Sequence, residues 1–184
     1  MKPSDIPNII TIFRFLLVAP VVVLLLNHQY GAALIVFAVA GFSDALDGYL
    51  AHHYGWSSRL GAMMDPLADK LLLICCFVTL GWLGLIPFWL VAVVILRDLV
   101  IVIGAMTYHW CVEYLDMAYP TLVSKLNTLA QIILVLAVMF SEAVQAVPAR
   151  WIDILLYSVL LTTIWSGLDY IWTWGRRAWS RRDD

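Results

Sequence analysis

Charged residues are scarce in this sequence. Of its 184 residues, 13% are Asp, Glu, Lys or Arg and 63% are hydrophobic. Soluble globular domains carry about 25% charged and about 45–50% apolar residues. So little charge excludes a disordered scaffold and a large soluble catalytic domain, and we expect no nucleic-acid partner. The composition predicts a small integral membrane protein.

Cysteine is also rare, with three residues in the chain. Cys75 and Cys76 are adjacent in one apolar run and Cys111 follows another, which does not fit the framework of a disulfide-stapled secreted module. We interpret the adjacent pair as small hydrophobic side chains.

Targeting signals are missing near the N-terminus. The first apolar run begins at Ile9, contains Arg14 and is not followed by a small-residue cleavage site, so we expect a retained membrane span. No Arg- and Ser-rich transit segment precedes this run, which favours the inner membrane of a bacterium over an organelle.

Six apolar runs are present, each of a length that can cross a bilayer as a helix of about 20 residues. They cover residues 9–26, 31–51, 61–80, 87–108, 122–140 and 151–174. No internal repeat is visible, which argues against an inverted-repeat transporter. The sequence predicts an all-α integral membrane protein with six transmembrane helices in a single domain, residues 1–184.

The positive residues predict how these spans are oriented, because Lys and Arg gather on the cytoplasmic side. If the N-terminus is cytoplasmic, Lys2, Arg59 and the basic tail at 175–184 lie inside, and the outer loops hold only Arg150. Both termini are then cytoplasmic. We expect the tail arginines to contact anionic headgroups of membrane lipids.

Four aspartates crowd into 26 residues, namely Asp44, Asp47, Asp65 and Asp69. One carboxylate at mid-bilayer costs about 2.5–3.5 kcal/mol, so a compensating partner is needed. The i, i+3 and i, i+4 spacings put each pair on one helix face. A short polar turn at 52–60 lets the two helices run antiparallel, with all four carboxylates near the cytoplasmic surface.

Ligation by several carboxylate oxygens suits Mg²⁺, Mn²⁺ or Ca²⁺ and not Zn²⁺, which prefers His or Cys. The cluster therefore predicts a site for one or two hard divalent cations. Gly48 directly follows Asp47, and Gly61 lies four residues before Asp65. A glycine lets a backbone or a ligand approach closely.

This pattern resembles the signature of the CDP-alcohol phosphotransferases, the class I CDP-alcohol phosphatidyltransferases. The matching residues read Asp44-x-x-Asp47-Gly48-x-x-Ala51 and, after His52 and eight further residues, Gly61-x-x-x-Asp65-x-x-x-Asp69. Seven of eight signature residues agree with every spacing intact. The departure is His52, where the family has arginine. The resemblance extends over essentially the whole chain.

The resemblance implies transfer of a phosphatidyl group from CDP-diacylglycerol to an alcohol, with release of CMP. It implies two Mg²⁺ or Mn²⁺ ions bound by Asp44, Asp47 and Asp65, with Asp69 as the general base and a further metal ligand. A homodimer is also implied. The residues that would bind CDP are Asn8, Thr11, Arg14, Asp47, Gly48, Ala51, His52, Arg59 and Gly61, with Arg59 supplying the charge that His52 lacks.

We expect the acceptor alcohol to be recognised by the region of about 97–131. The expected binding residues there are Arg97, Lys125 and Asn127. An intramembrane arginine faces the protein interior or a cavity. The run 120–131 resembles that of the eukaryotic-type, CMP-forming cardiolipin synthases, whose acceptor is phosphatidylglycerol. Phosphatidylglycerophosphate synthases, which use glycerol 3-phosphate, usually carry further cations where this chain has Ala105 and Asn127. Phosphatidylglycerophosphate synthesis is therefore the alternative function.

A divalent-cation transporter is a more remote alternative, since a cluster of carboxylates could also bind a transported cation. That function explains neither of the two glycines. It also predicts polar residues that reach the outer face, yet the predicted outer turns at 27–30 and 81–87 contain no acidic residue.

Overall fold

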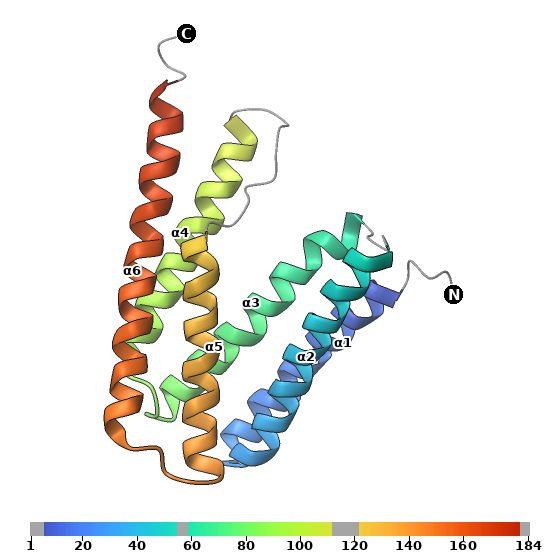
Figure 1. The fold of residues 1–184 in the computed structure, drawn as a ribbon, viewed down its shortest axis with the longest axis vertical. Coiled ribbons are helices and arrows are strands. Elements are labelled where there is room, and N and C mark those ends of the chain that lie inside the picture. Colours follow the sequence, from blue (N-terminus) through green and yellow to red (C-terminus); the bar gives the residue numbers. More distant parts are fainter. Residues whose placement is uncertain (1–5, 55–58, 112–121, 181–184) are drawn as a thin grey trace. The chain divides into compact units, whose positions relative to one another are not determined.

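The described residues of the computed structural model form six helices and no strands (Figure 1). The helices are α1 (Ile6–Leu26), α2 (Tyr30–Tyr54), α3 (Arg59–Trp82), α4 (Phe88–Cys111), α5 (Leu122–Ala143) and α6 (Ala149–Ser180). The structure describes the backbone of residues 6–54, 59–111 and 122–180, and the side chains of 12–43, 70–103, 122–170 and 172. The predicted all-α class and the six helical runs are confirmed.

The largest departure from the predicted bounds is at the end of α6. The sequence predicts that this helix stops at Gly175, whereas it continues to Ser180. A single glycine inside a helix costs about 1 kcal/mol relative to alanine, and no proline follows Gly175 to break the helix. The first part of the basic tail is therefore helical.

The chain divides into two compact units. The first comprises the residues up to Ile86 together with Val135–Val147, and the second comprises Pro87–Leu134 and the residues from Pro148 onward. In the first unit α1 packs against α2 and α3, and α2 contacts α3; in the second, α4 packs against α6. Helix α5 contributes its C-terminal part to the first unit and its N-terminal part to the second. The single domain over residues 1–184 stays a prediction.

The core of the first unit follows the three- and four-residue spacing of helix faces that meet. Its fully buried residues include Val21, Leu25, Ala33, Ala40, Cys76, Phe77 and Leu80. The alanines of α2 let helices approach closely, as small residues do in membranes. Cys76 is buried and Cys75 half-buried, and both thiols are free. The interpretation of this pair as small hydrophobic side chains is confirmed.

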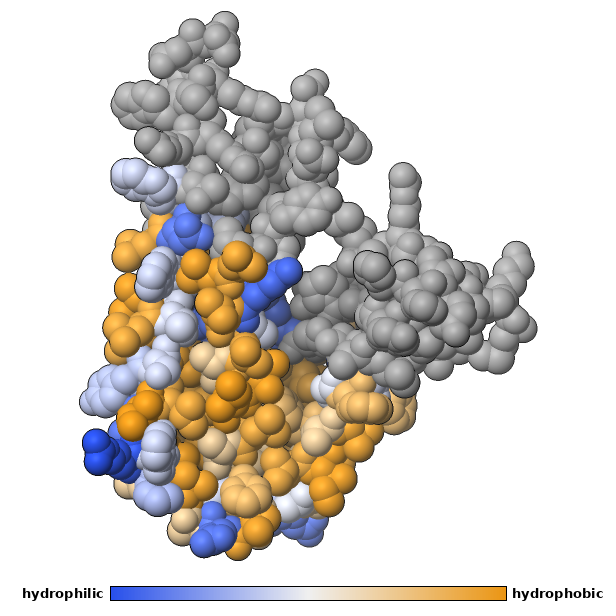
Figure 2. All heavy atoms as spheres, in the orientation of Figure 1, coloured by the Kyte–Doolittle hydropathy of each residue, from blue (hydrophilic) through white to orange (hydrophobic). Residues whose placement is uncertain are grey.

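Large apolar side chains cover much of the surface that the structure describes (Figure 2). Leu16, Phe42, Trp82 and Trp165 are each more than 60% exposed. Soluble monomers rarely expose contiguous apolar patches above a few hundred Å², so this surface favours contact with lipid. Two described segments, Leu122–Ala143 and Ala149–Tyr170, are long and apolar enough to cross a membrane. Six spans and cytoplasmic termini stay predictions.

Several hydroxyl groups in the helices are satisfied by their own backbone. Thr79 Oγ1 donates to the Cys75 carbonyl at 2.7 Å, and Ser158 Oγ donates to the Ile154 carbonyl at 2.7 Å. This bond to the carbonyl four residues earlier is common for Ser and Thr in helices. It lets a hydroxyl lie in an apolar environment without an unpaired donor.

Two helix ends are closed by the same motif. At the end of α1, the amides of His28 and Gln29 donate to the carbonyls of Leu25 and Leu24, both at 2.9 Å. At the end of α3, Gly84 and Leu85 make the equivalent bonds to Gly81 and Leu80, both at 3.0 Å. This is the Schellman motif, which needs a left-handed residue. That residue is His28 with φ of 58° in one turn and Gly84 with φ of 75° in the other.

We expect Gly84→Ala to lower the free energy of unfolding by about 1 kcal/mol, since L-residues are strained in the left-handed region. No atom lies within 4 Å of the Cβ that alanine would add, so the effect is one of backbone conformation. His28→Gly should be stabilising by a smaller amount, because it also removes the hydrogen bond between His28 Nδ1 and the Tyr30 hydroxyl. Thermal unfolding in detergent measures both; a Gly84→Ala protein as stable as the wild type would contradict the assignment.

Candidate functional site

The four predicted metal-binding aspartates lie on two contacting helices of the first unit. Asp44 and Asp47 belong to α2, and Asp65 and Asp69 belong to α3. Their side chains lie outside the described residues, so their convergence stays a prediction. The donor set on these two helices consists of carboxylate oxygens, which fits Mg²⁺ or Mn²⁺. Among the side chains that are described, no group of three His, Cys, Asp or Glu could hold a metal ion.

The residues predicted to bind CDP lie on these two helices and on α1. Asn8, Thr11 and Arg14 are on α1, Gly48, Ala51 and His52 are on α2, and Arg59 and Gly61 are on α3. Only the side chain of Arg14 lies within the described part, and it is fully buried. The guanidinium therefore faces the protein interior and not lipid, as expected for an intramembrane arginine. Its contact with CDP stays a prediction.

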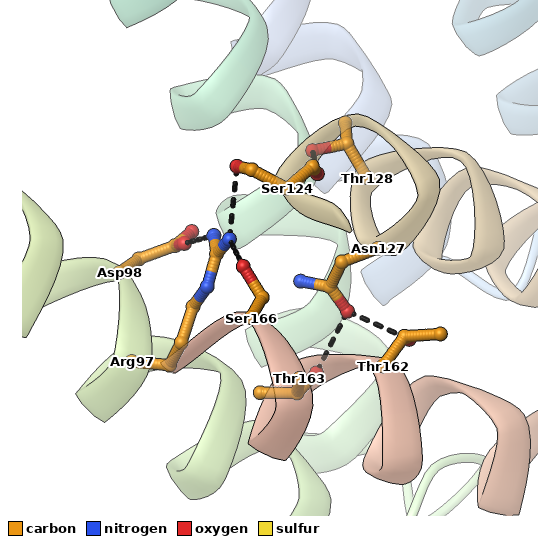
Figure 3. Close-up of polar contacts among 8 residues, drawn as sticks. All are labelled: Arg97, Asp98, Ser124, Asn127, Thr128, Thr162, Thr163 and Ser166. Atoms are coloured by element: carbon orange, nitrogen blue, oxygen red, sulfur yellow. Dashed lines mark hydrogen bonds and ion pairs between the residues drawn. The ribbon is translucent and has the colours of Figure 1, made fainter. Parts of the chain in front are cut away.

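Arg97, predicted to bind the acceptor, is the centre of a polar cluster in the second unit (Figure 3). Its Nη1 donates to Asp98 Oδ1 at 2.6 Å, and the side chains of the two residues are 5% and 10% exposed. Its Nη2 donates to Ser124 Oγ of α5 at 2.9 Å and to Ser166 Oγ of α6. One guanidinium thus connects α4, α5 and α6.

Burial and pairing fix the position of Arg97. The Asp98 carboxylate balances its charge, which a guanidinium in an apolar surrounding requires. Gly167 flanks its aliphatic stem, since a Cβ at that position would lie 3.8 Å from Arg97 Cγ. The stem therefore lies against the backbone of α6 while the guanidinium reaches the hydroxyls beside it.

Asn127 of α5 is fully buried and faces α6 (Figure 3). Its Oδ1 accepts from Thr162 Oγ1 and Thr163 Oγ1, both at 2.9 Å. Thr162 can donate instead to the Ser158 carbonyl at 2.9 Å, but Asn127 Oδ1 is the one acceptor recorded for Thr163 among the described residues. The amide oxygen is therefore held on α6, and the amide nitrogen points away from the threonines.

Lys125, the third predicted acceptor-binding residue, is separated from the other two. It is exposed, whereas Arg97 and Asn127 are buried. Residues one or two apart on a helix do not share a face, so Lys125 does not point in the direction of Ser124 and Asn127. The structure brings Arg97 and Asn127 to the same surface of α6 and leaves Lys125 outside this cluster.

The polar residues of α6 that hold this cluster were not predicted from the sequence. Thr162 and Thr163 lie four and three residues before Ser166 in an apolar run, and Gly167 follows Ser166. A hydroxyl-bearing helix face beside a small residue is a signal for close polar packing between membrane helices. Gln131, which closes the predicted acceptor region, was also not assigned a role, although it is only 2% exposed.

Comparison with known proteins gives matches over most of the chain. The family model described as CDP-alcohol phosphatidyltransferase matches residues 4–165. The chain is 33% identical over 192 residues to the CMP-forming cardiolipin synthases of Rattus norvegicus and Homo sapiens. It is 31% identical over 183 residues to the chloroplastic CDP-diacylglycerol–glycerol-3-phosphate 3-phosphatidyltransferase 1 of Oryza sativa subsp. japonica.

The alignments to the two cardiolipin synthases span 96% of this chain and 63% of each relative. The alignment to the Oryza sativa protein spans 90% of this chain and 56% of that relative. The family match includes every position of the aspartate signature on α2 and α3, and also Arg97 and Asn127. The chain belongs to the CDP-alcohol phosphatidyltransferase family.

Proposed function

We propose that this protein transfers a phosphatidyl group from CDP-diacylglycerol to a hydroxyl of phosphatidylglycerol, which yields cardiolipin and CMP. One observation carries the proposal. The aspartate signature lies on two contacting helices of a chain that is 33% identical to CMP-forming cardiolipin synthases over 96% of its length.

The reaction needs a base and a stabilised leaving group. The acceptor hydroxyl oxygen forms a bond to the phosphorus of the phosphatidyl group, and the bond from that phosphorus to the CMP oxygen breaks. Asp69 takes the hydroxyl proton. A carboxylate within hydrogen-bond reach of the hydroxyl can act as a general base, which suits this role.

Asp44, Asp47, Asp65 and Asp69 would together hold two Mg²⁺ or Mn²⁺ ions. When bound, these ions neutralise the charge of the pyrophosphate and of the departing CMP. Arg14, Asn8 and Thr11 on α1 would contribute to the CDP site from the helix that packs against both α2 and α3.

The Arg97–Asp98 pair supports phosphatidylglycerol as the acceptor. Because Asp98 balances the guanidinium, the Arg97 and Asn127 cluster offers hydrogen-bond donors with little net positive charge. Such a site suits a phosphodiester with one negative charge better than the dianionic phosphate of glycerol 3-phosphate. Lys125 would add a cation at the exposed side of α5. Phosphatidylglycerophosphate synthesis is the second candidate, since a relative at 31% identity bears that name.

The proposed setting is the inner membrane of a bacterium, with six spans, both termini and the active site on the cytoplasmic side, and a homodimeric assembly. The family match supports phosphatidyl transfer in preference to cation transport.

CMP release should depend on both the metal ion and the acceptor. With purified protein in mixed micelles that contain CDP-diacylglycerol and phosphatidylglycerol, we expect EDTA to reduce CMP release to background, and excess Mg²⁺ or Mn²⁺ to restore it. Omission of phosphatidylglycerol should have the same effect as EDTA. Release of CMP that persists with EDTA would contradict the metal site. Cation flux in proteoliposomes without CMP release would favour the transporter.

Arg59→Ala should raise the KM for CDP-diacylglycerol about tenfold, because a charge-assisted hydrogen bond to a phosphate is then lost. The kcat at saturating substrate should change little. Arg150→Ala is the matched control, since Arg150 is exposed at the start of α6. An unchanged KM in the Arg59 variant would contradict a role of Arg59 in binding CDP-diacylglycerol.

A further inference from the structure

Three buried nitrogen atoms of the second unit have no hydrogen-bond partner among the described residues. They are Arg97 Nε, Asn127 Nδ2 and Gln131 Nε2. A buried donor left without an acceptor costs about 1–3 kcal/mol, and such groups require an explanation. All three atoms carry N–H groups, so the missing partner offers acceptor oxygens. This excludes a cation as the ligand.

Two of the three donors lie on α5, and the third belongs to the Arg97 guanidinium of α4, which bonds to α5 at Ser124. Ser124, which accepts from Arg97, is followed by Asn127 three residues later and by Gln131 seven residues later, a spacing that keeps side chains on one helix face. At 1.5 Å per residue, the level of Gln131 lies about 10 Å from that of Ser124 along the helix. Figure 3 shows the Arg97 guanidinium bonded to Ser124 Oγ, and the side-chain amide of Asn127 farther along α5.

A diacyl lipid presents its groups in the same order. Its phosphodiester lies at the membrane surface, its two ester groups lie just below, and its hydrocarbon chains continue inward. A guanidinium is the preferred partner of a phosphodiester, whereas an uncharged amide N–H suits an uncharged carbonyl oxygen. Gln131 is uncharged and lies farther along α5 from Ser124 than Asn127 does, so in the predicted orientation of this helix it corresponds to the ester level.

We propose that Gln131 Nε2–H binds an ester carbonyl oxygen of the acceptor lipid and so selects a diacylated acceptor. This inference rests on the proposed function, in which the acceptor is phosphatidylglycerol held by Arg97 and Asn127. Glycerol 3-phosphate has no acyl ester and therefore no carbonyl oxygen, so it gains nothing from Gln131. Gln131 is then a specificity-determining residue of the acceptor site.

A binding role and a structural role predict opposite effects on stability. If Gln131 served packing alone, its replacement should be destabilising. If the amide N–H of Gln131 instead binds a ligand, Gln131→Leu removes a buried donor that is unpaired in the free protein. Leucine also fills a similar volume. The variant should then be at least as stable as the wild type. Gln145→Leu is the matched control, since Gln145 is exposed beyond the end of α5.

The test compares the wild type, Gln131→Leu and Gln145→Leu with two acceptors, dioleoyl-phosphatidylglycerol and a dialkyl-ether phosphatidylglycerol that lacks ester carbonyls. For Gln131→Leu we expect a KM about tenfold higher with the diester lipid, for the loss of one hydrogen bond. The KM with the ether lipid and the KM for CDP-diacylglycerol should match the wild type. The diester lipid should raise the Tm of the wild type more than that of the variant.

Equal KM increases with both lipids, or a higher KM for CDP-diacylglycerol, would overturn the assignment to an acceptor ester. A lower Tm for Gln131→Leu with unchanged KM would show a packing role. If the wild type forms no cardiolipin, the proposed function fails by itself, and the Tm comparison between diester and ether lipid still decides whether Gln131 binds an ester.

Discussion

Replacement of Asp69 by asparagine should abolish turnover while CDP-diacylglycerol binding is preserved. Asparagine has the shape of aspartate and keeps one carbonyl oxygen as a ligand, but it cannot accept the proton of the acceptor hydroxyl. General-base catalysis contributes about 10²–10⁴-fold to rate, so kcat should fall by at least about a hundredfold. Initial rates of CMP release and equilibrium binding of CDP-diacylglycerol measure the two properties separately.

Asp153→Asn is the control for Asp69, because Asp153 is an exposed aspartate at the start of α6, on the other unit. It should leave both rate and binding unchanged. If Asp69→Asn weakens CDP-diacylglycerol binding by the same factor as it lowers kcat, Asp69 acts chiefly as a metal ligand and another group must take the proton.

The second large effect is expected at Arg97. Arg97→Leu leaves the Asp98 carboxylate buried without this partner and removes the donor that joins Ser124 to Ser166. Breaking a buried pair on one side typically costs about 3–5 kcal/mol. We therefore expect a large loss of stability in thermal unfolding and little active protein. The single variant alone cannot separate folding from acceptor binding.

The double variant Arg97→Leu, Asp98→Leu separates the two roles. With both charges removed, a buried ion pair is replaced by apolar side chains, which is often neutral or stabilising. The double variant should regain most of the stability that the single variant loses, yet remain unable to use the acceptor. Arg150→Leu, at an exposed arginine, is the control. Recovery of near-normal activity in the double variant would show that Arg97 is purely structural.

Much of the fold could be predicted because membrane helices consist of long runs of apolar residues. All six runs are helical in the structure, and the turns at His28 and Gly84 lie between runs as expected. The end of α6 could not be placed from Gly175, because one glycine is a weak helix breaker when arginines and no proline follow. Local composition does not decide how far a helix continues beyond the apolar region.

The metal-binding part of the candidate site stays a prediction from a compact sequence signature, whereas the partners of Arg97 and Asn127 could not be predicted. The aspartates at 44–69 are close in sequence, so their spacing alone defines helix faces. The acceptor cluster joins Arg97 to Ser124, 27 residues away, and to Ser166, 69 residues away. Single Ser and Thr residues in an apolar run most often bond to their own helix, as Ser158 does. The hydroxyls of Thr163 and Ser166 bond to side chains of other helices, and this can be seen only from the way the helices pack.

The identity of the lipid product tests the central claim most directly. Purified protein is incubated with CDP-diacylglycerol and Mg²⁺ or Mn²⁺, with either phosphatidylglycerol or glycerol 3-phosphate as acceptor, and the lipid formed is identified by mass spectrometry. We predict cardiolipin, formed with phosphatidylglycerol and accompanied by an equal amount of CMP. Phosphatidylglycerophosphate as the sole product, formed with glycerol 3-phosphate, would contradict it.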